Sequence, residues 1–263
     1  MRRTGLTLLF GFALLQATVA APAIAGEANA ATTATPTLAA SVAAPGRPDA
    51  ARQLDESRKP AATLEFLGLE PGMDTADLIP GGGYWTEIMA HVVGPEGSVT
   101  ALEPEQFGSG EKAQAAWAEL IERTQGVTLT LYPFDKFTYA ADSFDFAIMN
   151  LNYHDLYWES EQYKVPATDP DIYLKALHTA MRSGGIVGII DHAGLPGDTR
   201  ETVDKLHRID PAVVRADFAR AGFVLEAESD LLANPDDDHT VSVFDPAVRG
   251  NTDRFLMRFR KPA

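Results

Sequence analysis

The chain has 263 residues, of which 45% are hydrophobic, so it is long enough to bury a sizeable core. Its formal net charge of -15 argues against a nucleic-acid partner, because an acidic surface repels phosphate groups. The sequence contains no cysteine, which excludes disulfides, thiolate nucleophiles and cysteine-ligated zinc.

Residues 1–25 have the pattern of a cleavable signal peptide. Arg2 and Arg3 precede an almost wholly apolar run, and the Ala-Ile-Ala segment at 23–25 offers a small-residue cleavage site. The apolar run is shorter than the roughly 20 residues that a membrane-spanning helix needs. We therefore expect a periplasmic or secreted protein with no stable membrane anchor after signal cleavage.

Residues 26–47 are dominated by Ala, Thr and Pro and show no amphipathic period, which predicts a disordered linker. The folded domain is expected at 48–263, where helical and strand patterns alternate. The expected helices span 49–58, 61–67, 84–93, 111–124, 170–181 and 211–221, with a further helical stretch after Thr199. The expected strands span 74–78, 98–102, 127–132, 144–151, 186–190, 223–229 and 255–260.

The inner strands are continuous apolar runs, which is typical of parallel strands covered on both faces by helices. No helix is expected between the last two strands, so these should pair antiparallel. The predicted fold is α/β: a doubly wound, mostly parallel seven-stranded sheet with one antiparallel strand, of the Rossmann-like type.

A glycine-rich turn links the first expected strand to the helix after it. Asp77 lies in that strand, and Gly81, Gly82 and Gly83 form the turn. Glu103 ends the next strand, where a carboxylate can accept hydrogen bonds from both ribose hydroxyls. Strand, glycine turn, helix and acid together predict a nucleoside site, which a glycine turn alone would not do.

The kind of nucleoside follows from the charges and the spacing. The glycines do not follow the G-x-G-x-x-G spacing of dinucleotide sites, and Tyr84 and Trp85 stand where that pattern needs a small residue. Asp77 favours a cationic ligand over a pyrophosphate. S-adenosylmethionine (SAM), which carries an ammonium and a sulfonium and no phosphate, meets these requirements.

These motifs resemble those of class I SAM-dependent methyltransferases. The resemblance covers roughly residues 49–262 and is carried by the segments 77–83, 83–86 and 93–99 and by Glu103. The chain is also similar to a group of exported bacterial "predicted methyltransferases", which share the Arg-Lys-Pro at 58–60 and the segment 249–253. One departure is Ile79, which stands where the class usually has glycine.

The resemblance implies a set of cofactor contacts. Asp77 and the glycines would hold the methionine portion, Glu103 the ribose, and Phe134 with Asp135 the adenine. The full implied set is Asp77, Gly81, Gly82, Gly83, Tyr84, Glu103, Phe134, Asp135 and Asn150.

Polar residues follow the fourth and fifth expected strands, whose carboxyl ends are neighbours at the ligand crevice of such a sheet. His154 or His192 is a candidate general base, because histidine titrates near neutral pH. The resemblance implies that Asn150 and Asn152 would face the methyl group. Two alternatives stay open. Asn150 or Asn152 with Asp191 and His192 could bind a divalent metal, or these side chains could merely cap the ends of strands and helices.

The function expected is SAM-dependent methyl transfer to an oxygen or nitrogen nucleophile of a small molecule or an exported protein. The alternative is a methyltransferase-like fold in the cell envelope that binds a different ligand without methyl transfer. Two further segments are expected at the surface: His207-Arg208, which could also act as a lid, and a solvated acidic turn at 236–239.

Overall fold

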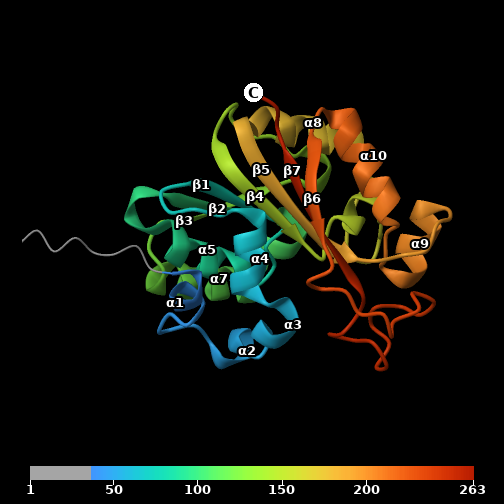
Figure 1. The fold of residues 1–263 in the computed structure, drawn as a ribbon, viewed down its shortest axis with the longest axis horizontal. Helices are drawn as coiled ribbons and strands as arrows, with labels where there is room; N and C mark the ends of the chain where they lie inside the picture. Colours follow the sequence, from blue (N-terminus) through green and yellow to red (C-terminus); the bar gives the residue numbers. More distant parts are fainter. Residues whose placement is uncertain (1–36) are drawn as a thin grey trace, which may run out of the picture. The chain divides into compact units, whose positions relative to one another are not determined.

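A computed structural model describes residues 37–263, which form one compact unit with a seven-stranded sheet. Helices cover both faces of this sheet (Figure 1). Residues 1–36 lie outside the described residues, and with them the predicted signal peptide and the first part of the predicted linker. Among residues 37–263, no helix is long and apolar enough to cross a membrane.

The sheet has the strand order β3-β2-β1-β4-β5-β7-β6. The strands are β1 (Asp74–Leu78), β2 (Ser98–Pro104), β3 (Val127–Tyr132), β4 (Phe144–Asn150), β5 (Met181–His192), β6 (Val224–Ser229) and β7 (Arg254–Arg260). The helices are α1 (Leu38–Val42), α2 (Asp49–Arg52), α3 (Asp55–Arg58), α4 (Pro60–Leu67), α5 (Tyr84–Val93), α6 (Glu105–Gly108), α7 (Glu111–Arg123), α8 (Pro170–Ala180), α9 (Thr199–Leu206) and α10 (Pro211–Ala221). Strands β1 to β5 pair in parallel, and β7 runs antiparallel to both β5 and β6. The predicted fold class is confirmed.

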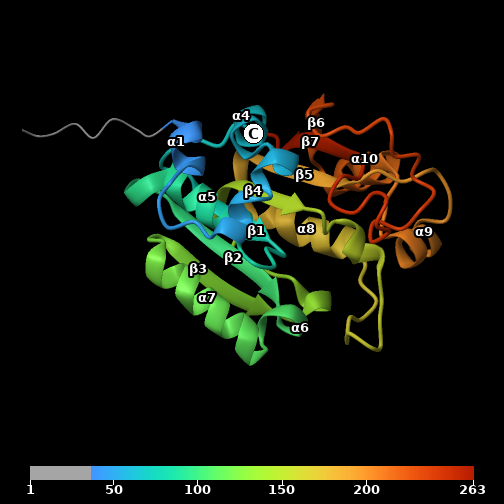
Figure 2. The ribbon, with the colours of Figure 1, turned by 90° about the horizontal axis from the view of Figure 1, so that it is seen from below.

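The central strands bury both of their faces, as their apolar sequences predicted. In β4, Phe146 and Ile148 belong to the core under α4 and α5, whereas Ala147 and Met149 belong to the core under α8 and α10. This division follows the two-residue period of a strand. At the edge of the sheet, α7 lies beside β3 (Figure 2). Its Trp117 packs against side chains of β2 and β3.

Several predicted boundaries were wrong. The helix expected at 49–58 is divided into α2 and α3, and the short helix α6 was not predicted. The strand expected at 186–190 begins at Met181, because Gly184 and Gly185 lie within β5, beside an irregularity in its pairing with β4.

The linker prediction also fails for residues 37–47. Helix α1 contacts α4 and α5, and the Ser41 hydroxyl donates to the His91 carbonyl at 3.2 Å. The Arg47 side chain is fully buried and donates to both oxygens of Asp55 at 2.8 and 2.9 Å. The alanine-rich sequence predicted disorder, but small side chains also let a segment pack closely, and the ion pair of Arg47 with Asp55 connects this segment to α3.

We expect Arg47→Met to lower the free energy of unfolding by about 2 kcal/mol, because it leaves Asp55 without its partner beside the buried Tyr84. Chemical denaturation would measure the change. Arg215→Met is the matched control, since Arg215 pairs with Glu228 at the surface and its loss should cost about 1 kcal/mol or less. Equal effects for the two variants would contradict the assignment of residues 37–47 to the folded domain.

The segment between β6 and β7 is anchored by a second buried pair. Arg208 donates to both oxygens of Asp237 at 2.9 Å, and both side chains are fully buried. The surface position expected for Arg208 was therefore wrong. Within the turn expected to be solvated at 236–239, Asp237 is buried, whereas Asp236 and Asp238 are exposed. The sequence predicts that Asp237 is acidic, but it does not predict an ion pair with Arg208, which lies in a distant segment.

Candidate functional site

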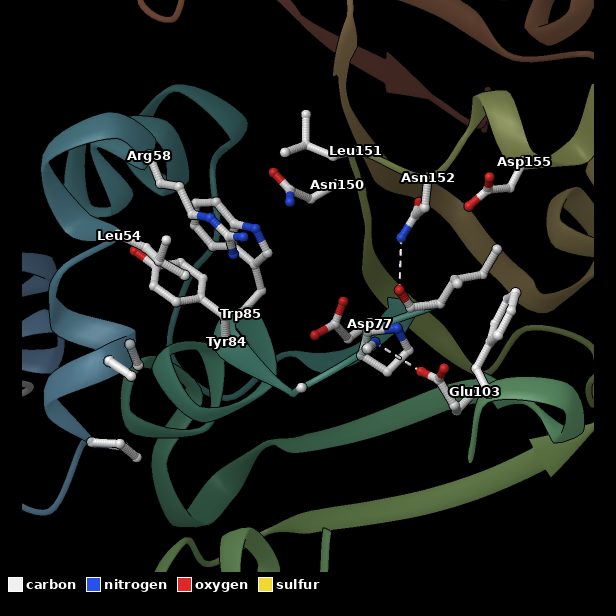
Figure 3. A pocket seen from close by; sticks show the side chains of 18 residues that line it. Leu54, Arg58, Asp77, Tyr84, Trp85, Glu103, Asn150, Leu151, Asn152 and Asp155 are labelled. Carbon is white, nitrogen blue, oxygen red and sulfur yellow. Dashed lines mark hydrogen bonds between the residues drawn. The ribbon is translucent and has the colours of Figure 1, made fainter. Parts of the chain in front are cut away.

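The carboxyl ends of β1, β2 and β4 open into a cavity of about 620 Å³ (Figure 3). Asp77, Glu103 and Asn150 line it from these three strands, and the glycine turn forms part of its wall. Residues of α2 and α3 line the cavity as well, so the segment before the first strand covers the site.

The glycine turn is open to the cavity at two of its three glycines. A side chain added at Gly81 or Gly82 would meet no atom within 4 Å, so a ligand can approach the backbone there. Gly83 differs, because its added Cβ would lie 2.4 Å from Leu120 Cδ1 on α7. Gly83 is needed for close packing of the helices and, contrary to expectation, does not line the cavity.

Ile79 has a backbone conformation that is usual for glycine. Its φ is 54°, a left-handed conformation that a β-branched residue rarely adopts. Its N–H donates to the Leu102 carbonyl at 2.9 Å, and its carbonyl accepts from the Asn152 amide at 2.7 Å. The departure from the usual glycine therefore leaves the turn intact, at a cost in backbone strain of about 1–3 kcal/mol.

Ile79→Gly should be more stable than Ile79→Ala by about 1 kcal/mol, because only glycine avoids the strain of a positive φ. Both variants lose the buried Ile79 side chain, so the comparison isolates the backbone. Thermal or chemical unfolding of the pair tests this. The usual order, with alanine more stable than glycine, would mean that the turn is not strained.

Two buried carboxyl groups face the cavity. The Thr86 hydroxyl donates to Asp77 at 2.6 Å, and the Gly81 N–H donates to Glu103 at 2.8 Å. Burial raises the pKa of Asp77 to about 7 and that of Glu103 to about 8. Neither acid forms an ion pair within residues 37–263, so a cationic ligand would supply the missing positive charge.

Tyr84 and Arg58 form the wall of the cavity opposite Glu103 (Figure 3). The Tyr84 hydroxyl donates to Asp55 at 2.7 Å, which connects α5 to α3. The Arg58 guanidinium lies over the Tyr84 ring, 4.3 Å from its centre. Tyr84, predicted as a cofactor contact, thus lines the cavity and also supports a cation at its edge.

The two residues expected around the adenine do not line the cavity. Phe134 is buried and does not line the cavity, and Asp135 is exposed. Phe107 on α6 lines this cavity and a second one of about 460 Å³ that shares Gly81, Gly82 and Glu103. Phe107 packs edge-on against Phe134, with ring centres 6.2 Å apart. Sequence reasoning missed Phe107, although its position four residues after Glu103 was a signal.

Asn152, expected to face the methyl group, supports the glycine turn. Its amide donates to the carbonyls of Leu78 at 3.1 Å and Ile79 at 2.7 Å. Its Oδ1 atom is buried and has no hydrogen-bond partner within residues 37–263. A ligand donor in the cavity would satisfy this oxygen.

The two histidines expected as bases do not line the cavity. His154 is buried between Asp191, whose Oδ1 lies 2.8 Å from Nδ1, and Asp155, whose Oδ1 lies 3.5 Å from Nε2. Burial opposes the charge on His154, but attraction to Asp191 and Asp155 outweighs it and raises the pKa to about 9. Burial lowers the pKa of His192 to about 3, and its Nδ1 lies 2.6 Å from the Thr252 hydroxyl.

Asp155 is the member of this group that reaches the cavity. Burial raises its pKa to about 6, although attraction to His154 acts in the opposite direction. Since His154 is engaged by carboxylates on both ring nitrogens, it can orient Asp155 but cannot itself reach a ligand. Sequence reasoning placed Asp155 in this cluster without separating its position from those of the histidines.

The metal alternative gains no support from the arrangement around Asp191. Both of its oxygens accept hydrogen bonds, from the His154 N–H at 2.8 Å, the His154 ring and the His192 N–H at 2.7 Å. In the described part of the chain, no three His, Asp or Glu side chains are grouped so as to hold a metal ion.

The sheet order, the reversed β7 and the helices on both faces define a class I methyltransferase fold. The SAM-dependent methyltransferase from Aquifex aeolicus matches 81% of this chain and 97% of its own, with a TM-score of 0.56 and 18% identity. The methyltransferase in the Haloferax volcanii complex with the Trm112 activator matches 86% and 98%, with the same TM-score and identity. The [4+2]-cyclase SpnF matches 81% and 82%, with a TM-score of 0.53 and 16% identity. No protein-family model matches the sequence, and neither does any curated protein.

Proposed function

We propose that this protein binds SAM and transfers its methyl group to an acceptor that carries an O–H or N–H group. The observation that carries the proposal is the pair of buried acids, Asp77 and Glu103, which face one cavity across an open glycine turn. Neither has a cation partner in residues 37–263. The ammonium and sulfonium of SAM would supply positive charge near Asp77, and its ribose hydroxyls would donate to Glu103.

A dinucleotide is a poorer fit to the same cavity. Its pyrophosphate would lie against the turn, next to two carboxyl groups that must lose protons as the pH rises. Phosphate sites use backbone N–H groups and cations, but here the Gly81 N–H already donates to Glu103. The charge of the site therefore favours the cationic nucleoside.

The acceptor would enter beside Asn152 and Asp155, on the side of the cavity away from Arg58 (Figure 3). Asp155 would take the acceptor proton while the acceptor oxygen or nitrogen attacks the methyl carbon. As the new bond forms, the carbon–sulfur bond breaks on the opposite side of the methyl carbon, its electron pair stays on sulfur, and S-adenosylhomocysteine remains. A pKa of about 6 leaves Asp155 mostly ionised at neutral pH, as a general base requires.

SAM with a tritiated methyl group, incubated with the purified protein and with envelope and extracellular fractions of the producing cells, tests the function. The wild type should transfer label to a small molecule or a protein. Asp155→Asn should bind S-adenosylhomocysteine normally but transfer at least about 100-fold more slowly. Absence of any binding of SAM or S-adenosylhomocysteine by the wild type would overturn the proposal.

The similarity to SpnF, named as a [4+2]-cyclase, favours a second candidate: the fold and its cavity without methyl transfer. Under this candidate the nucleoside would bind while no acceptor receives label. Binding and transfer measured on the same preparation distinguish the two functions.

We further propose that the protein acts outside the cytoplasm, on the basis of the signal-peptide pattern in residues 1–25. Cell fractionation and the N-terminal sequence of the mature protein test this. A mature chain that starts near residue 26 in the periplasm or medium is expected. A chain that keeps residues 1–25 and stays in the cytoplasm would contradict it.

A further inference from the structure

The guanidinium of Arg58 has no charged partner among the residues that the structure describes. This guanidinium is half-buried and lines the cavity, yet it forms no ion pair or hydrogen bond with any of residues 37–263. The buried Arg47 and Arg208 are each paired with a carboxylate, Asp55 and Asp237. In a chain with 37 acidic residues, an unpaired guanidinium inside a cavity points to an anionic group on the ligand.

The Arg58 side chain is also held in place. It lies over the Tyr84 ring, and the Tyr84 hydroxyl is fixed by Asp55, which Arg47 fixes in turn. Burial lowers the pKa of Arg58, which means that holding its charge away from water costs free energy. A cation fixed in advance loses little freedom when a partner binds.

The surroundings of Arg58 define the chemistry of that partner. Asp77 lies across the same end of the cavity and attracts Arg58 without forming an ion pair (Figure 3). Arg254 is nearby, but its guanidinium donates to the carbonyls of Ser57 and Gly250 and does not line the cavity. An acid and a cation that are apart and unpaired match a group with an ammonium and a carboxylate, which is an α-amino acid.

We propose that Arg58 binds the carboxylate of the amino-acid end of the nucleoside, while Asp77 binds its ammonium. This inference rests on the proposed function, because the amino acid is the methionine portion of SAM. Arg58 is the last residue of α3 and belongs to the segment that covers the cavity, so a bound cofactor would connect this segment to the glycine turn. Arg58 thereby becomes a residue that discriminates SAM from nucleosides without an amino-acid group.

Isothermal titration with two ligands tests this. S-adenosylhomocysteine carries the amino-acid group, and 5′-methylthioadenosine keeps the nucleoside and the thioether but lacks that group. Arg58→Met should weaken S-adenosylhomocysteine about 10- to 100-fold and leave 5′-methylthioadenosine within about twofold, as expected for one charge-assisted contact. Arg58→Lys should retain part of the affinity. The control is Arg249→Met, which removes an exposed arginine and should change neither ligand.

Three results would overturn the inference. If Arg58→Met leaves S-adenosylhomocysteine unchanged, Arg58 has another partner. If it weakens both ligands equally, Arg58 supports the wall of the cavity and does not contact the carboxylate. In both cases the wild type still binds, so the proposed function stands. If the wild type binds neither ligand, the proposed function fails and the assignment of Arg58 fails with it.

Discussion

Glu103→Gln should weaken the binding of S-adenosylhomocysteine by roughly 100-fold above pH 8, because the ribose hydroxyls lose a charged acceptor. Glu103 is the acid at the end of β2, almost completely buried, with one oxygen accepting from the Gly81 N–H. Glutamine has nearly the same shape, so the loss reports the charge and not the packing.

Glu103 and Asp77 together should make the affinity for the nucleoside depend on pH, and binding should release protons. Burial raises the pKa values of Asp77 and Glu103 to about 7 and about 8, so at pH 7 the ligand-free protein keeps much of both protons. A cationic nucleoside stabilises the ionised forms, so binding at pH 7 should release roughly one to one and a half protons. Affinity should rise with pH and level off above about 8.

Titration calorimetry in two buffers that differ in ionisation enthalpy measures the released protons. Glu103→Gln should reduce the release to roughly half a proton, which comes from Asp77. An affinity that is flat from pH 6 to pH 9, without proton release, would mean that the ligand does not use these acids.

A stability measurement shows that this variant is folded. A carboxyl whose pKa is raised in the folded state stabilises the fold below its unfolded pKa and loses that contribution as the pH rises through the folded pKa. For Glu103 the loss is complete above about pH 8. Glu103→Gln cannot ionise, so it should unfold at a higher temperature than the ligand-free wild type at pH 9.

The part of the site that sequence predicted well is local along the chain. Asp77, the glycine turn and Glu103 lie within one strand–turn–helix–strand unit, so their order predicts their proximity in space. The sheet was predictable for the same reason, because apolar runs and two-residue alternation report burial directly. Even Ile79 did not disturb the turn, since hydrogen bonds from both sides hold its backbone.

The parts that sequence did not predict depend on contacts between distant segments. Arg58 was part of a recognised motif, but its place in the cavity requires Tyr84 to pack against α3. His154 was predicted as a base because histidine titrates near neutral pH, yet attraction to Asp191 from the next strand and to Asp155 outweighs burial and raises its pKa to about 9. The type of a residue limits the protonation states that it can have, and its contacts in the folded protein determine which of these states is stable.

Asp191→Asn should lower the free energy of unfolding by about 3–5 kcal/mol near pH 6, because it leaves His154 buried without its main counter-charge. Asp191 is fully buried and accepts from the His154 N–H, the His154 ring and the His192 N–H. Asparagine keeps the size of the side chain but removes the charge and one acceptor.

The pH dependence of this difference identifies the pair. Burial opposes ionisation of Asp191, but attraction to His154 lowers its pKa, so its contribution is present above about pH 4 and lost in acid. The raised pKa of His154 gives a contribution that is complete below about pH 6.5 and lost as the pH rises through about 9. The free energies of unfolding of the wild type and Asp191→Asn should therefore differ most between about pH 4 and about pH 6.5 and converge above about pH 9.

Urea denaturation at pH 6 and at pH 10 measures both differences. Asp145→Asn is the matched control, since Asp145 pairs with Arg182 near the surface and should cost about 1 kcal/mol or less at either pH. Because Asp155 is oriented by His154, Asp191→Asn should also slow methyl transfer while binding of S-adenosylhomocysteine persists. A variant as stable as the wild type at pH 6 would mean that His154 is neutral in the fold. Asp155 would then lack the cation that lowers its pKa and so keeps it ionised at neutral pH.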